Sequence, residues 1–292
     1  MKDRFIDKQF RKKSLERIQQ INAIINEYME SSYSLTIRQV YYQLVSRDII
    51  PNKQSEYGKI SALVTDARRA GLIDWNAIED RTRYIRRRNH YASPGEAVRD
   101  SAYMYGTDLW SDQEHYVEVW VEKDALIGIV QQAAARYDVT SFSCRGYTSD
   151  SAIYSAAQRI RAQIDAGKKP VILHLGDHDC SGVDMSRDIL ERLELFARKP
   201  GMIDLHRIAL NMDQIQTFKP PVNPAKESDS RYAAYVSRYG VNSWELDALP
   251  PEVLTQIIED NILKHMNVYR FIDAKRKEEA EQAELFRLAD AI

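Results

Sequence analysis

Apolar positions near the start of the chain recur at the spacing of short helices. In residues 14–30, apolar side chains return every three or four positions, which places them on one helical face. Two further helices are predicted at 36–48 and 55–71, each opened by a hydroxyl residue of the type that caps helices, Thr36 and Ser55. The chain is therefore predicted to begin with three short helices.

An arginine-rich stretch with alternating polar and apolar residues follows these helices. The alternation across residues 82–86 is typical of a strand or hairpin. Three helices followed by a hairpin form the order of a winged helix-turn-helix, in which the third helix approaches the major groove and the wing holds phosphates. We predict that basic residues of the third helix and of the wing bind DNA. These residues are Lys59, Arg68, Arg69, Arg81, Arg83, Arg86, Arg87 and Arg88.

From residue 115 onward, short apolar strands alternate with amphipathic helices. Strands are predicted at 115–124, 139–144, 170–175 and 205–211. A helix between each pair predicts an α/β fold with a parallel sheet and helices on its faces. The polar residues 90–100 include Ser-Pro-Gly and are predicted to be a linker. We expect a winged-helix domain at 1–95, a sheet domain at 110–215 and a mostly helical C-terminal extension at 216–292.

The charge is distributed unevenly along the chain. Residues 1–100 hold 19 Lys+Arg and 13 Asp+Glu, whereas residues 101–292 hold 22 and 30. This asymmetry predicts a basic module for a polyanion, although a basic run is also typical of a solvated face. No apolar run is long enough to cross a bilayer and no apolar leader opens the chain, so we expect a cytoplasmic protein without a membrane partner.

Carboxylates follow two of the predicted strands at the point where each strand ends. Glu122 ends the first strand, and Asp177 and Asp179 follow the third in "HLGDHDCSG". Because active groups gather beyond the carboxyl ends of parallel strands, these three can converge. Close carboxylates repel one another unless a cation shares the site, and Mg²⁺ prefers oxygen ligands. We therefore predict a Mg²⁺ site, with Mn²⁺ as an alternative.

Other interpretations of these residue types stay open. Acidic residues directly after a strand also cap the helix that follows, as expected for Asp124. His174 and His178 are potential zinc ligands, but no His-x-x-x-His helix pattern accompanies them. His174 lies within a predicted strand, where a buried core imidazole is the simpler interpretation.

The motifs "VEKDAL", "RGYTSDS" and "HLGDHDCSG", in this order, resemble the Toprim fold of topoisomerases, primases and several nucleases. The resemblance covers roughly residues 115–215. It implies that Glu122, Asp177 and Asp179 hold Mg²⁺ in a metal-dependent active site. Cys180 departs from the pattern, because related sequences often have proline there.

The N-terminal module extends the resemblance. A winged helix carrying "TIRQVYY" before a Toprim domain resembles the A subunit of type IIB topoisomerase (topoisomerase VI) and the related meiotic double-strand-break protein. In that family an arginine precedes, by four positions, a tyrosine that attacks a DNA phosphodiester; here these positions are Arg38 and Tyr42. Their spacing places both on one helical face. Aromatic residues in such a helix are mostly core, so either Tyr41 or Tyr42 must face inward.

This resemblance implies Mg²⁺-dependent cleavage of double-stranded DNA. Either Tyr42 attacks the phosphodiester, or water does, as in Toprim nucleases of SMC-like plasmid-defence complexes. The family also implies a homodimer, because the tyrosine of one subunit works with the metal site of its partner. The chain has no P-loop, so an ATP-driven step would need a separate ATPase subunit.

Two other classes of function compete with DNA cleavage. The first is a DNA-binding regulator with a degenerate, non-catalytic body. The second is a phosphatase, since Asp-x-Asp after a strand also occurs in haloacid-dehalogenase-like enzymes. The segment "WELDALPPEVL" leaves a further choice open. It resembles a late segment of Toprim nucleases in which Glu245 and Asp247 add acid near the site, but its prolines also start a helix.

Overall fold

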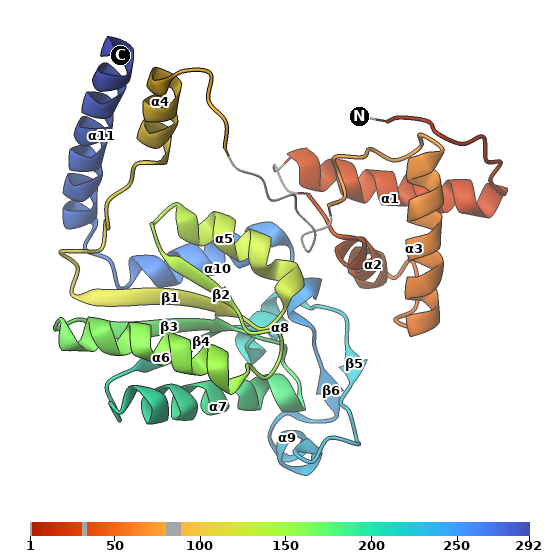
Figure 1. The fold of residues 1–292 in the computed structure, drawn as a ribbon. Helices are drawn as coiled ribbons and strands as arrows, with labels where there is room; N and C mark the ends of the chain where they lie inside the picture. The colour runs from red at the N-terminus through yellow and green to blue at the C-terminus, as the bar shows by residue number, and fades with distance from the viewer. Residues whose placement is uncertain (1, 31–33, 80–88) are drawn as a thin grey trace.

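The N-terminal part of the computed structural model consists of three helices, as the apolar spacing predicts (Figure 1). The structure describes residues 2–30, 34–79 and 89–292. The three helices are α1 (Lys12–Glu30), α2 (Ile37–Ser46) and α3 (Gln54–Arg69). The predicted wing at 82–86, with Arg81, Arg83, Arg86, Arg87 and Arg88, lies outside the described residues.

Local chemistry sets where these helices begin. Thr36 caps α2 as expected: its hydroxyl accepts a hydrogen bond from the Gln39 N–H (3.2 Å), and the Gln39 side chain accepts one from the Thr36 N–H (2.8 Å). Ser55 does not cap α3, because the helix begins one residue before it and Lys53 occupies the cap position. Isoleucine, leucine and valine side chains from all three helices form one core, which includes Ile21, Leu44 and Val64.

Residues 115–209 form a four-stranded, wholly parallel sheet, which confirms the predicted α/β fold. Its strands are β1 (His115–Val121), β2 (Thr140–Ser143), β3 (Lys169–Leu175) and β4 (Asp204–Ala209), in the spatial order β2-β1-β3-β4. Side chains alternate between the faces. Val119 and Leu173 pack with one apolar cluster, whereas Trp120 and Ile172 pack with another.

Helices cover both faces of the sheet (Figure 1). The first cluster joins the sheet to α5 (Ile127–Ala135) and α10 (Pro251–Leu263), and the second joins it to α6 (Asp150–Asp165) and α7 (Cys180–Ala197). The remaining elements are η1 (Asp124–Leu126), α8 (Met212–Phe218), β5 (Asn223–Pro224), α9 (Tyr232–Tyr239), β6 (Asn242–Ser243), η2 (Leu246–Ala248) and α11 (Val268–Ala291). No helix in the described ranges is long and apolar enough to cross a membrane.

The segment predicted to be a linker contains a helix, α4 (Pro94–Met104). The Ser93 side chain accepts a hydrogen bond from the Glu96 N–H (3.1 Å), and Pro94 occupies the first helical position. Ser-Pro therefore acts here as a helix start instead of a turn. α4 lies along α11, where the Tyr103 and Phe286 rings are 4.9 Å apart (Figure 1). The capped start and the contact with α11 together distinguish the helix from a polar linker.

One strand carries a fully buried carboxylate, that of Glu118. Its oxygens accept hydrogen bonds from Arg159 of α6 (Nε 2.8 Å, Nη2 2.9 Å), from the Tyr116 hydroxyl (2.6 Å) and from the Trp120 indole (2.9 Å). These partners replace the water that Glu118 loses on folding.

Replacing Arg159 with methionine is expected to lower the free energy of unfolding by about 3–5 kcal/mol, because the Glu118 charge would remain buried without its counterion. Arg161→Met, on the same helix, is the matched control. Arg161 pairs with Asp165 at 3.6 Å and both side chains are more than 40% exposed, so the expected loss is at most about 1 kcal/mol. Urea denaturation of the two variants checks this, and equal losses would contradict it.

Candidate functional site

The carboxyl ends of β1 and β3 bring Glu122 next to Asp177, as the sequence predicts. The two strands are parallel neighbours, and each residue follows its strand directly or after one glycine. The Asp177 N–H donates a hydrogen bond to Glu122 Oε2 (2.9 Å). The ends of two neighbouring strands therefore place two carboxylates at the same edge of the sheet.

A third segment reaches this edge from near the end of the chain. His178 and Trp244 exchange two backbone hydrogen bonds (2.9 and 3.0 Å), which fix the start of "WELDAL" beside "GDHD". The Leu246 N–H then donates to Asp177 Oδ1 (2.7 Å). As a result, Glu245 and Asp247 join Asp177.

The residues that could hold a metal ion are Asp177, Glu245 and Asp247, which we call the acidic triad. Each offers one oxygen that lies within 4.8 Å of the others. The Asp247 side chain is 1% exposed, and its Oδ2 has no hydrogen-bond partner among the described residues. A buried oxygen left without a partner is unusual in a folded protein. This oxygen, in an all-oxygen donor set, fits a hard divalent cation such as Mg²⁺.

Lys123 is the cationic partner of the acidic triad. Its Nζ lies 3.0 Å from Asp177 Oδ2 and 2.9 Å from Asp247 Oδ1, and it also contacts Glu245 Oε2. One ammonium among three ionised carboxylates leaves a formal charge of −2. A buried site with this excess charge favours either bound protons or a divalent cation.

The pKa values follow from this burial. Burial raises the pKa of Asp177 well above its usual value, and it also raises the pKa of Asp247; Lys123 opposes both shifts. Burial disfavours the charge of Lys123, but the three carboxylates outweigh that effect and hold the pKa of Lys123 well above its usual value. The ammonium thus stays charged while Asp177 and Asp247 retain a tendency to bind protons.

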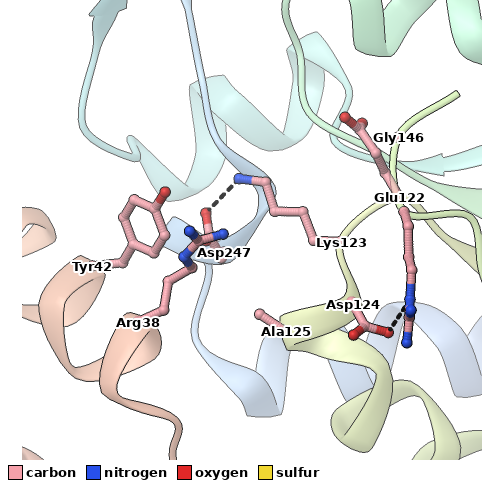
Figure 2. A pocket seen from close by; sticks show the side chains of 9 residues that line it. Arg38, Tyr42, Glu122, Lys123, Asp124, Ala125, Gly146 and Asp247 are labelled. Atoms are coloured by element: carbon pink, nitrogen blue, oxygen red, sulfur yellow. Dashed lines mark hydrogen bonds and ion pairs between the residues drawn. The ribbon is translucent and has the colours of Figure 1, made fainter. Parts of the chain in front are cut away.

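The two other predicted ligands lie beside the acidic triad but are not part of it. Glu122 accepts the Asp177 N–H, and its carboxylate points away from the tips of Lys123 and Asp247 in Figure 2. Burial raises the pKa of Glu122, and the hydrogen bond from Asp177 partly offsets this.

Asp179 occupies the N-cap of α7, where its carboxylate accepts hydrogen bonds from the Gly182 N–H (2.6 Å) and the Ser181 hydroxyl (3.0 Å). Its position after a strand is also the position before a helix, so capping is the role that the geometry shows. Metal binding by Glu122 and Asp179 stays a prediction.

Two interactions hold the segment "GDHDCSG", and with it Asp177, in place. A Cβ on Gly182 would lie 2.2 Å from the Asp177 carbonyl oxygen, so only glycine permits this close approach. The half-buried Arg207 guanidinium donates to the carbonyls of Gly176 (2.8 Å), Asp177 (2.5 Å) and Gly182 (2.8 Å). The loop that carries Asp177 is therefore fixed by the backbone and by a cation from β4.

A cavity of about 370 Å³ joins the N-terminal helices to this edge of the sheet. Arg38 and Tyr42 of α2 line it together with Lys123 and Asp247 (Figure 2). The Lys123 Nζ lies 5.4 Å from the centroid of the Tyr42 ring. The structure therefore brings Arg38 and Tyr42 close to part of the acidic triad of the same chain.

The structure settles which tyrosine of "VYY" faces inward. Tyr41 is buried, and its hydroxyl accepts a hydrogen bond from the Lys53 N–H (2.9 Å) and lies 3.0 Å from Asn52 Oδ1. Tyr42 is half-buried and lines the cavity. Burial raises the pKa of Tyr42, so its hydroxyl keeps its proton at neutral pH. Asp247 adds to this rise and Lys123 opposes it.

The predicted DNA-binding residues that the structure describes differ in their environment. Lys59 and Arg69 are exposed on α3. Arg68 is turned inward: its Nη2 donates to the carbonyls of Trp75 (2.8 Å) and Ile78 (3.0 Å), and its guanidinium lies 4.4 Å from the Trp75 ring. The Arg68 side chain therefore stabilises the N-terminal part, and DNA binding by all three stays a prediction.

Sequence reasoning missed Arg145, which lines the cavity. It follows β2 and is 71% exposed, and its Nε lies 3.2 Å from Asp124 Oδ1. Its φ of +54° is uncommon for a residue with a Cβ. The motif "RGYTSDS" contains Arg145, but nothing in that motif alone indicates that the guanidinium reaches the site.

Both histidines of "HLGDHD" are core residues. His174 is fully buried; its Nδ1 lies 2.8 Å from Ser186 Oγ, and burial lowers its pKa to about 3. His178 is buried against aromatic rings, its Nδ1 lies 2.9 Å from the Tyr235 hydroxyl, and burial lowers its pKa to about 4. The interpretation of His174 as a core imidazole is confirmed.

The lowered pKa of His174 makes stability depend on pH. The imidazole is neutral in the folded chain, whereas the unfolded chain binds a proton below about pH 6.5. Its stabilising contribution is thus complete above pH 6.5 and is lost as the pH falls toward 3. Between pH 6 and 4.5, the wild type is expected to lose about 1.4 kcal/mol per pH unit relative to His174→Gln. Urea denaturation at several pH values measures this difference, and parallel curves would contradict it.

Comparison with protein-family models, with curated proteins and with solved structures finds no match to this chain. No family is assigned. The parallel sheet of order 2-1-3-4 and the buried acidic triad are compatible with a Toprim-like body.

Proposed function

We propose that this protein is a divalent-metal-dependent enzyme that cleaves double-stranded DNA. One observation carries the proposal: the acidic triad lies at the edge of a parallel sheet, and its member Asp247 lines a cavity together with Arg38 and Tyr42. Metal ligands, a cation and a hydroxyl side by side are the groups that phosphodiester cleavage requires.

The cavity supplies cationic side chains for a phosphodiester. Arg38 and Arg145 are exposed at its rim, one from α2 and one from the loop after β2. Guanidinium groups bind phosphate oxygens through paired hydrogen bonds, which fix orientation as well as charge. A backbone phosphate in this cavity would thus lie near both Tyr42 and Asp247.

In the transesterification mechanism, the Tyr42 hydroxyl oxygen attacks phosphorus. A bond forms between this oxygen and phosphorus, and the bond from phosphorus to the 3′ oxygen breaks. Tyr42 gives up its proton, the departing 3′ oxygen takes one, and the 5′ phosphate remains on the tyrosine. Asp177, Glu245 and Asp247 would hold Mg²⁺ or Mn²⁺, which supplies stabilisation of the charge on the phosphate oxygens. Arg38 holds the phosphate and favours the phenolate.

In the hydrolytic mechanism, a water oxygen attacks phosphorus and Tyr42 only lines the cavity. The raised pKa of Tyr42 supports this route, because a phenol that keeps its proton is a weak nucleophile. The position of Arg38 four residues before Tyr42, on the same face of α2, supports the tyrosine route. Both routes use the same metal ligands.

We propose a homodimer as the working form, because cutting both strands requires two sites. Tyr42 lies near the acidic triad of its own chain, so each chain would bring a tyrosine and a metal site together. A separate ATPase subunit is proposed only for a reaction that passes one duplex through another.

A DNA-binding regulator without catalysis is the second candidate. Lys123 favours it, because its ammonium contacts all three triad carboxylates and offsets part of their negative charge. Such a protein would bind DNA with a strong salt dependence and would not cut it.

Incubation of the full chain with supercoiled plasmid tests the proposal. Nicked or linear DNA is expected with Mg²⁺ or Mn²⁺ and none with EDTA. Phenol extraction before and after protease treatment then distinguishes protein-linked ends from free ends, and so transesterification from hydrolysis. Salt-dependent binding without cleavage in either metal would contradict the enzyme and support the regulator.

A further inference from the structure

The ammonium of Lys123 lies where a cation shared by the acidic triad would lie. Its Nζ is within 3.0 Å of oxygens of Asp177 and Asp247 and also contacts Glu245, the same residues that offer ligand oxygens to a metal. The Lys123 side chain is only 19% exposed. The acidic triad is therefore already held together by a cation from the chain itself.

We infer that Lys123 is a positioning residue that competes with the divalent cation for the acidic triad. The ammonium keeps the carboxylates assembled while no metal is bound, and the metal ion enters only as the ammonium leaves. The inference rests on the proposed function in one respect, that the triad is the metal site, and it does not depend on DNA cleavage.

Electrostatics makes the two cations exclusive. A divalent ion and an ammonium about 4 Å apart repel each other enough to weaken binding about thirtyfold, even at the dielectric constant of water. The low exposure of Asp177 and Asp247 increases this repulsion. Lys123 must therefore move before the ion can bind tightly.

The cavity offers space into which the Lys123 ammonium can move. Lys123 lines it, and the Tyr42 ring centroid is 5.4 Å from Nζ (Figure 2). A lysine stem of four carbons can rotate without movement of the backbone. The face of an aromatic ring attracts a cation, so the released ammonium can stay beside Tyr42.

Mn²⁺ binding to the full chain, followed by electron paramagnetic resonance without DNA, tests the competition. Lys123→Met is expected to bind Mn²⁺ at least about tenfold more tightly than the wild type, because the competing charge is gone. Lys123→Arg retains the charge and is expected to bind far more weakly than Lys123→Met. Lys275→Met, at an exposed position of α11, is the control and is expected to match the wild type.

A second measurement uses the wild type and does not depend on the folding of a variant. An amine-acetylating reagent is expected to modify Lys123 slowly in EDTA and several-fold faster in Mg²⁺, as mass spectrometry of the peptides would show. Lys275 is expected to react equally in both. Unchanged labelling of Lys123, or a folded Lys123→Met variant that binds Mn²⁺ no more tightly than the wild type, overturns the inference. Tighter Mn²⁺ binding without DNA cleavage leaves the inference standing and removes only the proposed function.

Discussion

Asp247→Asn is expected to lower the rate of metal-dependent DNA cleavage by roughly 10²-fold or more. Mutation of a residue that only supports a metal ligand already lowers metal affinity or activity by about 10- to 100-fold. Asp247 is itself a candidate ligand, and its Oδ2 has no hydrogen-bond partner among the described residues. In EDTA the variant is expected to be at least as stable as the wild type, because one of three crowded negative charges is removed. Plasmid cleavage and thermal unfolding measure the two effects separately.

The control for this variant is Asp273→Asn on α11, where the side chain is 76% exposed. This change is expected to alter neither cleavage nor stability beyond about 0.5 kcal/mol. Full cleavage by Asp247→Asn, or a loss shared with a large drop in stability, would contradict a metal-ligand role for Asp247.

Tyr42→Phe is expected to abolish protein-linked DNA ends if transesterification operates, a loss of roughly 10³-fold or more that follows from removing the nucleophile. The fold should persist, because the phenyl ring remains and the hydroxyl faces the cavity. Protein-linked ends are measured by phenol extraction and cleavage by gel electrophoresis. A Tyr42→Phe protein that still cuts and leaves free ends would exclude the tyrosine route and support hydrolysis.

Tyr41→Phe is the matched control, one residue away on the same helix. The Tyr41 hydroxyl forms hydrogen bonds with Asn52 and Lys53, at the end of the loop before α3. Loss of this hydroxyl is expected to lower the free energy of unfolding by about 1–2 kcal/mol. Cleavage should continue, because Tyr41 does not line the cavity. If Tyr41→Phe lowered cleavage as much as Tyr42→Phe does, the Tyr42 hydroxyl would affect cleavage only through the stability of the fold.

Regular elements were predictable where periodicity alone decides them. The apolar runs that end at Val121 and Leu175 form neighbouring strands. Such continuous apolar runs are expected of strands in a sheet that helices cover on both faces. Asp177 was predictable for the same reason, since it follows the end of a parallel strand. α4 was missed, because Ser-Pro-Gly is compatible with both a turn and a helix start.

Part of the candidate site was left open by sequence reasoning, which offered Glu245 and Asp247 either as acid near the site or only as residues before a helix start. Asp177 and Glu245 are 68 positions apart, and only the backbone bridge between His178 and Trp244 makes them neighbours. Asp179 illustrates the opposite case: the sequence pairs it with Asp177, yet its carboxylate caps α7. Spacing along the chain does not show which of two acids turns toward the site.

The sequence by itself determined the three N-terminal helices, the parallel strands and the accumulation of acid at the strand ends, because these depend on side-chain periodicity over a few residues. Only the tertiary structure decided that Lys123 lies among the acidic triad and that Tyr42, rather than Tyr41, faces it. Such contacts join residues that are distant in the chain. They depend on how whole elements pack, and no local pattern contains that information.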